Sequence, residues 1–401
     1  MKKLFTLALC GLAFISVSAQ KATVEQAKRL IGKTEKIEEA RSLIKEALQN
    51  PETANQALTY YTAGKIEWDA FDKNAAKQMV NPESVNKVDM SNELLNGYDY
   101  FIRVFPLDQV PNEKGEVKPK YTKELQKKIS EKNPNFWDAG AVFYGEQMYY
   151  PQAYNAFMIA GDMPELEVLG NQRPVVADTT RAIAYFNAGL SAWSANQVDA
   201  AALAFRKARE NNYTQPQACI YEIACWQNIE QNDSTRENEA RDNIFNAAKG
   251  GYEKFGMEQP VFLNNMVNSL INRKQENAAV ELVNGAISNY PEIASLYGLR
   301  AYVYDRMGNE DASVEDYTKA ASMNGVDYET LRNAVTKLLR VGQEKWNAIE
   351  LNDPNRRDKQ AQIRTQYFES AKKIAEQAKS IAEDPADMDY LIESIDYTLS
   401  L

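Results

Sequence analysis

Apolar residues between positions 259 and 326 recur with the spacing of helices. They fall three and four residues apart, which places their side chains on one face of an α-helix. Four such positions mark one helix, three mark the next, and the same marks return 34 residues later. The first set is Leu263, Met266, Val267, Leu270, Ala279, Val283 and Ala286, and the second is Tyr297, Arg300, Ala301, Tyr304, Ser313, Tyr317 and Ala320.

Side-chain size alternates within each 34-residue unit. Positions 8, 20 and 27 hold small residues, whereas positions 4, 11 and 24 hold larger ones. This alternation predicts two helices that cross closely at the small residues while the large ones fill the space between them. One pair cannot bury its own apolar face, so consecutive pairs must stack. Pro291 cannot continue the second helix and predicts a turn into the next unit.

The same marks recur along the chain, less regularly near its start. They comprise Val24, Ala27, Ile31, Ala40, Ile44 and Ala47; Tyr60, Ala63, Gly64, then late Gly97, Phe101 and Val104; Phe136, Ala139, Gly140, Phe143, Ala153, Phe157 and Ala160; Tyr185, Ala188, Gly189, Ala201, Phe205 and Ala208; Tyr221, Ala224, Cys225, Arg241, Phe245 and Ala248; and Leu331, Ala334, Val335, Leu338, Arg364, Phe368 and Ala371. No strand-like alternation is long enough to indicate a sheet.

The pattern therefore predicts five segments. These are a leader (1–19), irregular units (20–106), a linker or loop with a lead-in helix (107–132), a regular array (133–325), and a last unit with a polar insertion and a capping helix (326–401).

Several of these marks resemble the tetratricopeptide-repeat (TPR) signature, and the architecture resembles exported TPR proteins of Gram-negative bacteria. The resemblance implies an all-α fold, a TPR-type right-handed α-α superhelix of about eight helix pairs plus a C-terminal capping helix. It also implies a concave face, lined by the first helix of each pair, that receives a peptide or a partner helix. Position 4 is never Trp here, unlike in the family. The residues that carry the likeness are Gly189, Ala201, Phe205, Ala208, Ala279, Ala286, Pro291, Ala301, Gly308 and Ala320.

The first nineteen residues have the pattern of a secretory signal peptide. Lys2 and Lys3 precede an apolar stretch over residues 4–17, and small residues then lead to a cleavage site before Gln20. The stretch is shorter than the roughly 20 residues that a spanning helix needs. We therefore expect an exported protein, periplasmic or outer-membrane-associated, with no transmembrane segment.

Charge and composition narrow the possible functions. The net charge is −10, and loss of Lys2 and Lys3 with the leader would take it to −12. Such an acidic chain is a poor candidate for nucleic-acid binding, which requires phosphates to be neutralised by Lys and Arg. Histidine is absent, which removes most zinc sites and most Ser-His or Cys-His nucleophiles. We expect neither a metal nor a cofactor.

Cys219 and Cys225 remain after the leader is removed. Six residues on one helix place them about 9 Å apart along its axis, beyond the roughly 7 Å between Cα atoms that a disulfide allows. We interpret both as buried free thiols.

Three patterns could indicate catalysis or ion binding, but each has a simpler interpretation. Residues 27–34 fit a relaxed phosphate-binding loop, yet an amphipathic helix ending at Gly32 stands where the mechanism needs a strand. Carboxylates such as Glu310, Asp311 and Asp384 indicate a solvated acidic surface, since a glycosidase needs two carboxylates placed across a sugar. Residues 353–358 lack the Gly and final Glu of a calcium loop. We therefore expect no enzyme.

In the TPR family, positions 2, 5, 9, 12 and 13 of the first helix face the groove. Aromatic and Arg residues there would be binding hot spots, although they could instead pack between neighbouring helices. The change from aromatic residues early to Asn and Arg late suggests a ligand with one apolar end and one polar or acidic end. The candidate groove residues are Tyr61, Lys65, Trp68, Trp137, Tyr144, Phe186, Trp193, Trp226, Asn264, Asn268, Tyr302, Arg306 and Arg332.

The sequence thus favours a non-enzymatic scaffold that binds a protein or peptide, as a helix or an extended segment in a groove. Two alternatives stay open. One is a glycan-binding helical protein, because indole rings also stack on sugars. The other is a carboxylate-based glycan hydrolase, which would need a deep cleft with paired acids.

Overall fold

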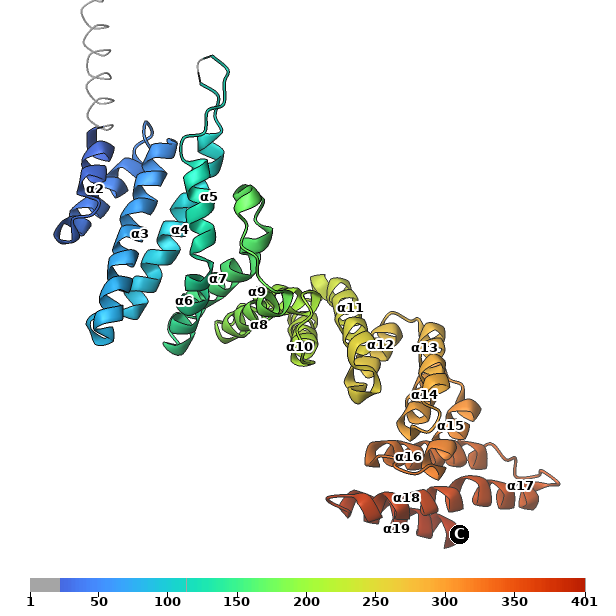
Figure 1. Ribbon diagram of the computed structural model, residues 1–401. Coiled ribbons are helices and arrows are strands. Elements are labelled where there is room, and N and C mark those ends of the chain that lie inside the picture. Colours follow the sequence, from blue (N-terminus) through green and yellow to red (C-terminus); the bar gives the residue numbers. More distant parts are fainter. Residues whose placement is uncertain (1–21, 113, 401) are drawn as a thin grey trace, which may run out of the picture. The chain divides into compact units, whose positions relative to one another are not determined.

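The computed structural model describes residues 22–112 and 114–400, and the regular elements in these two stretches are all helical (Figure 1). The expected signal peptide lies outside the described residues. The chain divides into two compact units, the first ending at Ile229 and the second beginning at Glu230. This division falls inside the 133–325 stretch; the segment boundaries predicted from the sequence stay predictions.

The first unit begins with a helix over residues 22–30. Gly32 follows with a φ of +91°, a left-handed conformation that ends the helix. A helix, and not a strand, thus precedes this glycine, and the interpretation of residues 27–34 as a helix end is confirmed. The further helices are α2 (Ile37–Gln49), α3 (Ala57–Val80), α4 (Lys87–Asp108), α5 (Thr122–Glu131), α6 (Asn133–Gly145), α7 (Tyr150–Asp162), α8 (Asp178–Ser194), α9 (Val198–Glu210) and α10 (Gln217–Asn232), whose last turn crosses the division.

Helices of this unit pack in consecutive pairs. Helix α3 packs on α4, α6 on α7 and α8 on α9, while α4 contacts α6 and α7 contacts α8 to join one pair to the next. The side chains between them form one continuous core that includes Phe101, Phe136, Phe143 and Phe157. Each pair buries its apolar face against its neighbour, as the sequence pattern predicts. Cys219 and Cys225 are buried and form no disulfide within the described residues, also as predicted.

A glycine of the first helix meets an aromatic ring of the second helix in three pairs. A Cβ atom built on the glycine would stand only 2.5 to 2.7 Å from the ring, closer than any side chain tolerates. The two helices can approach this closely only because position 8 is glycine, which leaves room for the aromatic ring at position 24 of the second helix. The pairs are Gly64 with Phe101, Gly140 with Phe157, and Gly189 with Phe205.

A segment outside the helix pairs joins α4 to α5. Its far end is held by Asp108, whose carboxylate accepts hydrogen bonds from the amides of Lys120 (2.9 Å), Tyr121 and Thr122 (both 2.8 Å) and from the Thr122 hydroxyl (2.8 Å). Burial alone would raise the pKa of the Asp108 carboxyl, but these four donors outweigh it and hold the pKa below its usual value.

Replacing Asp108 with Asn should release this segment, because the amide nitrogen of Asn cannot accept hydrogen bonds. We expect the free energy of unfolding to fall by about 2 kcal/mol and trypsin to cleave after Lys114 and Lys120 faster. Asp138→Asn, at an exposed position of α6, is the matched control.

The stability that Asp108 contributes should also depend on pH. Because the folded-state pKa of Asp108 is depressed, this stability is present above the unfolded-state pKa of about 3.9 and is lost as the pH falls through the folded-state pKa. Thermal unfolding of wild type and variant should therefore converge in acid; a difference that persists there would contradict the assignment.

The second unit continues with consecutive helices. Helix α11 packs on α12, α12 on α13, α13 on α14, α14 on α15, α15 on α16, α16 on α18 and α18 on α19. Their bounds are α11 (Glu237–Phe255), α12 (Pro260–Asn272), α13 (Glu276–Asn289), α14 (Ala294–Arg306), α15 (Glu310–Ser322), α16 (Tyr328–Asn347), α17 (Arg356–Ile363), α18 (Ser370–Ile381) and α19 (Ala386–Ser400). None of the described helices is long and apolar enough to cross a membrane.

The last pair contains one feature that the sequence did not predict. A π-helical turn over Arg364–Glu369 joins α17 to α18. Tyr367 and Phe368 are both buried there, and both lie against Gly342 of α16. Consecutive residues of an α-helix point about 100° apart, so the wider π turn lets both rings face the same neighbour.

The capping helix is confirmed as α19. It packs on α18 and buries Met388 and Ile395 against it. The described residues are thus an all-α array of helix pairs that ends in a capping helix, and the predicted fold class is confirmed.

Candidate functional site

A cavity of about 680 Å³ opens on α12, α14 and α16, which are successive first helices in the second unit. Two of these helices start from a defined local signal. Pro260 begins α12, where its fixed φ suits the first turn, and Asp327 caps α16 by accepting hydrogen bonds from the Thr330 amide and hydroxyl, both at 2.8 Å. The cavity therefore lies on the helices expected to line a TPR groove.

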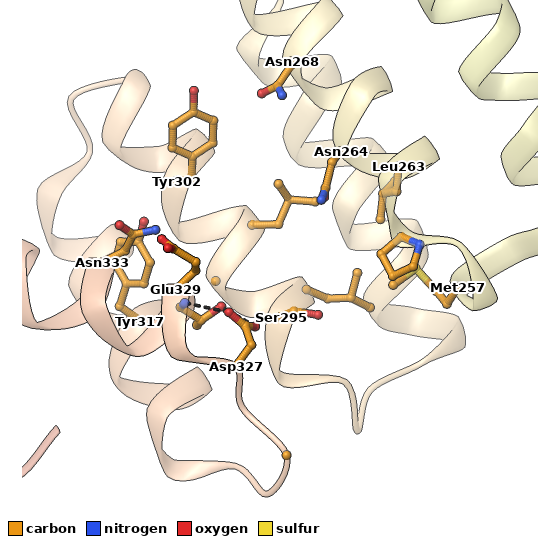
Figure 2. A pocket seen from close by; sticks show the side chains of 16 residues that line it. Met257, Leu263, Asn264, Asn268, Ser295, Tyr302, Tyr317, Asp327, Glu329 and Asn333 are labelled. Carbon is orange, nitrogen blue, oxygen red and sulfur yellow. Dashed lines mark hydrogen bonds between the residues drawn. The ribbon is translucent and has the colours of Figure 1, made fainter. Parts of the chain in front are cut away.

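The 34-residue repeat explains which side chains reach the cavity. Ser295 and Glu329 occupy position 2 of their helices, Asn264 occupies position 5, and Asn268 and Tyr302 occupy position 9. Figure 2 shows Asn264 and Asn268 on one wall and Glu329 and Asn333 on the other. The full lining is Met257, Pro260, Leu263, Asn264, Asn268, Ser295, Leu296, Gly298, Leu299, Tyr302, Tyr317, Gly325, Asp327, Glu329, Thr330 and Asn333.

The chemistry of the lining is polar and acidic. Asparagine side chains supply both donors and acceptors, Tyr302 exposes 36% of its surface, and Tyr317 is buried at the base, where burial raises its phenol pKa to about 12. Asp327 and Glu329 are the charged members of the lining. The cavity can therefore hydrogen-bond a polar chain and attract a cation.

Three predicted groove residues, Asn264, Asn268 and Tyr302, come together in this cavity. Arg306 and Arg332 are exposed but do not line it, and Arg332 lies 3.9 Å from the carboxylate of Asp387 on α19. The lining therefore offers carboxylates and no guanidinium group, which argues against the acidic ligand end suggested by the sequence.

Sequence reasoning missed Ser295, Glu329 and Asn333. Ser295 and Glu329 stand 34 residues apart at position 2, so the same repeat rule would have found them. Neither is an aromatic or Arg residue, the types that dominate binding hot spots. Asn333 occupies position 6, which lines the cavity here although the family pattern does not include it.

In the first unit, the predicted residues of α3 are largely covered. Tyr61 stacks on Tyr121 with ring centroids 4.2 Å apart and donates a hydrogen bond to Glu124 at 2.8 Å. Trp68 is buried and its indole nitrogen donates to the Leu94 carbonyl at 3.0 Å. Lys65 is half-buried and lines a second, smaller cavity with Trp68.

The other aromatic candidates of this unit differ in exposure. Trp193 is the most open, with 46% of its surface exposed, and Tyr144 follows with 38%. Trp137 is half-buried and meets Phe157 edge-on at 5.6 Å. The remaining two are Phe186, half-buried and stacked on Tyr213 at 4.3 Å, and Trp226, which is buried. Burial leaves Trp68 and Trp226 little surface for a ligand, whereas Trp193 and Tyr144 keep theirs.

Within the part of the chain that the structure describes, no three Cys, Asp or Glu residues gather closely enough to hold a metal ion.

Comparison with known proteins identifies one segment. The tetratricopeptide repeat family matches residues 294–327, which comprise α14, α15 and the turn before α16. No curated protein matches the sequence.

Three solved structures are among those that resemble the chain. They are yeast Tom70 (12% identity, 96% of each chain covered, TM-score 0.24), the TPR domain of P58(IPK) (11% identity, 82% of this chain and 99% of that chain, TM-score 0.23), and Naa15/Naa10 bound to HypK-THB (11% identity, 94% and 73%, TM-score 0.18). At these TM-scores the likeness supports no conclusion about function. The family match identifies one tetratricopeptide repeat, at residues 294–327, among the stacked helices of the second unit.

Proposed function

We propose that this protein is a non-enzymatic scaffold that binds an extended segment of a partner protein along α12, α14 and α16. TPR repeats suggest a protein-interaction scaffold, and a fold of this type is typically a non-catalytic one. The observation that carries the proposal is the 680 Å³ cavity on these three helices, into which repeat positions bring Asn264, Asn268 and Tyr302.

The spacing of the two asparagines favours an extended chain. Asn264 and Asn268 are one helical turn apart, about 6 Å along the axis of α12. Backbone groups two residues apart in an extended peptide are separated by about 6.6 Å. Each amide side chain can therefore pair with a successive backbone group that points toward α12, and this pairing is independent of the peptide's sequence.

The charged residues of the cavity favour a basic side chain in the bound segment. Glu329 is exposed, and the described residues place no cation within ion-pairing distance of it. Asp327 adds a second carboxylate to the same wall. A Lys or Arg of the partner would complement both, and we expect binding to weaken as salt increases.

The proposal predicts that Tyr302→Ala raises the Kd of a bound peptide about tenfold or more, because an aromatic anchor in a groove contributes at least about 1.4 kcal/mol. Peptides would be selected from a random phage-displayed library on the purified protein, and their Kd values measured by fluorescence anisotropy. Glu329→Gln should weaken selected peptides that carry Lys or Arg and leave neutral ones unchanged.

Tyr397→Ala is the matched control, because Tyr397 is a more exposed tyrosine on α19, outside the cavity. It should leave every Kd unchanged. Selected peptides that bind the Tyr302 variant as tightly as wild type would show that this groove is not the binding site.

We further propose that the protein is exported to the periplasm or the outer membrane. The pattern of residues 1–19 supports this placement. Fractionation of cells, with the N-terminus of the purified protein determined by mass spectrometry, tests it: the expected product starts at Gln20, and a cytoplasmic protein that retains Lys2 and Lys3 would exclude export.

A further inference from the structure

A second cavity, of about 230 Å³, lies between α3 and α5 in the first unit. Helix α5 stands outside the helix pairs, and the residues before it are held by Asp108. Side chains at both ends of α5 reach α3, where Glu124 accepts a hydrogen bond from Tyr61 and Lys132 pairs with Asp72. The cavity is lined by Lys65, Trp68, Asp69, Asp72, Phe101, Lys128, Glu131 and Lys132. It therefore combines an aromatic base with charges of both signs.

The carboxylates at this cavity all have cationic partners. Asp69 pairs with Lys73 at 2.9 Å and also accepts a hydrogen bond from the Gly32 amide at 3.1 Å. Asp72 pairs with Lys132. Glu131 lies 3.7 Å from Lys127.

Lys128 is paired as well, because Glu124, just outside the lining, approaches it to 2.7 Å. Lys65 differs, because within the described residues no carboxylate lies within ion-pairing distance of its ammonium group. Among its charged neighbours, the cation of Lys128 has the largest effect on the Lys65 pKa. The three lysines and three carboxylates of the lining, counted together with their ion-pair partners Lys73, Lys127 and Glu124, make five lysines and four carboxylates. One positive charge, that of Lys65, is thus left without a counter-ion.

The environment of Lys65 makes this charge costly without a ligand. Burial lowers the pKa of the Lys65 ammonium, and Lys128 lowers it further, against the smaller opposing effect of Glu124 and Asp69. An anion placed between Lys65 and Lys128 would offset the repulsion between the two cations and favour the charged form of Lys65.

The base of the cavity is formed by buried aromatic rings. Trp68 and Phe101 meet edge-on, with ring centroids 4.8 Å apart, and expose only 4% and 0% of their surface. The Lys132 ammonium stands 5.7 Å from the centroid of the Trp68 ring, so a ligand in this cavity would meet the charged side chains around these rings.

We propose that this cavity binds a single carboxylate group through Lys65 and Lys128. The uncompensated charge is one, so a monoanion neutralises the site, whereas a doubly charged phosphate would add repulsion with Asp69 and Asp72. The site lies within the first unit and is independent of the groove on α12, α14 and α16.

Benzoate is the probe, with benzamide as its neutral analogue and inorganic phosphate as the doubly charged anion. In the purified full-length protein, millimolar benzoate should slow the acetylation of Lys65 by limiting acetic anhydride, as followed by mass spectrometry, while the rate at exposed Lys127 stays constant. Benzamide and phosphate should not protect Lys65. This arm requires no variant and so does not depend on the folding of one.

Calorimetric titration of variants gives the second arm. Lys65→Gln should raise the Kd for benzoate about tenfold or more, since it removes a charge-assisted hydrogen bond. Lys123→Gln, at an exposed position of α5 outside these ion pairs, should leave it unchanged, and so should Tyr302→Ala, which separates this site from the peptide groove.

A short peptide ending in phenylalanine, with a free or an amidated C-terminus, distinguishes the source of the carboxylate. Binding of the free but not the amidated form means that the cavity takes a chain end, and binding of benzoate alone means that it takes a free aromatic acid. Equal protection by benzamide, tighter Lys65-dependent binding of phosphate, or absence of benzoate protection would each overturn the proposal.

Discussion

Replacing Phe205 with Ala is expected to lower the free energy of unfolding by about 4 kcal/mol, the range for truncating a fully buried aromatic side chain. Phe205 exposes only 1% of its surface. Its ring lies against Gly189 of α8 and meets Tyr221 of α10 edge-on at 5.4 Å. The truncation would leave a cavity where α8, α9 and α10 converge. Urea denaturation followed by circular dichroism and tryptophan fluorescence measures the loss.

Leu203→Ala is the matched control on the same helix, because Leu203 exposes 43% of its surface. It should cost less than about 1 kcal/mol. Similar losses in the two variants would show that Phe205 is not the packing centre of this pair.

The contact between Gly189 and Phe205 should also produce a coupling. Gly189→Ala alone places a Cβ about 2.5 Å from the Phe205 ring, so it should destabilise the protein. In a Phe205→Leu background the smaller side chain leaves room, and the same change should cost less. The double-mutant cycle is expected to give an interaction energy of about 1 kcal/mol; additive effects would mean that α8 and α9 adjust without this contact.

Replacing Asp316 with Ala is expected to lower the free energy of unfolding by about 3 kcal/mol, because it leaves a half-buried guanidinium without its counter-charge. Arg300 of α14 donates two hydrogen bonds to Asp316 of α15, at 2.6 and 2.7 Å, and a third to the Asn284 side chain of α13, at 2.6 Å. The hydrogen bond to Asp316 is the main cause of a raised Arg300 pKa. One side chain thus ties three consecutive helices together.

Asp311→Ala provides the comparison on the same helix. Asp311 is exposed and pairs with Lys345 at 3.3 Å, and exposed pairs contribute little. Thermal and urea unfolding should place this variant within about 0.5 kcal/mol of wild type. A loss for Asp316→Ala no larger than this would show that the Arg300 contacts do not stabilise the array.

Helix existence and pairing were predictable because they depend on contacts close in sequence. The 34-residue spacing places position 8 of one helix opposite position 24 of the next, and the contact between Gly189 and Phe205 follows from that spacing alone. Part of the cavity lining was predictable for the same reason: Asn264, Asn268 and Tyr302 occupy repeat positions that face one side.

The covering of the early groove candidates was not predictable. Tyr61 is stacked on Tyr121, which belongs to a segment outside the repeats and lies sixty residues further along the chain. The position of such a segment has no periodic signal. Whether Lys65 stands free or paired depends likewise on where α5 packs. The π turn at Arg364–Glu369 was not predictable for the same reason, because it depends on packing against α16 and has no pattern in its own sequence.

By itself, the sequence determined that this protein is an array of helix pairs and which residues make the close crossings within each pair, because helical spacing and repeat offset are local properties of the chain. Only the tertiary structure decided which first-helix side chains remain open to a ligand, that carboxylates and not Arg line the late groove, and that Lys65 lacks a counter-charge. Those features arise from long-range packing of segments without a repeat, whose positions are set by the surfaces they cover.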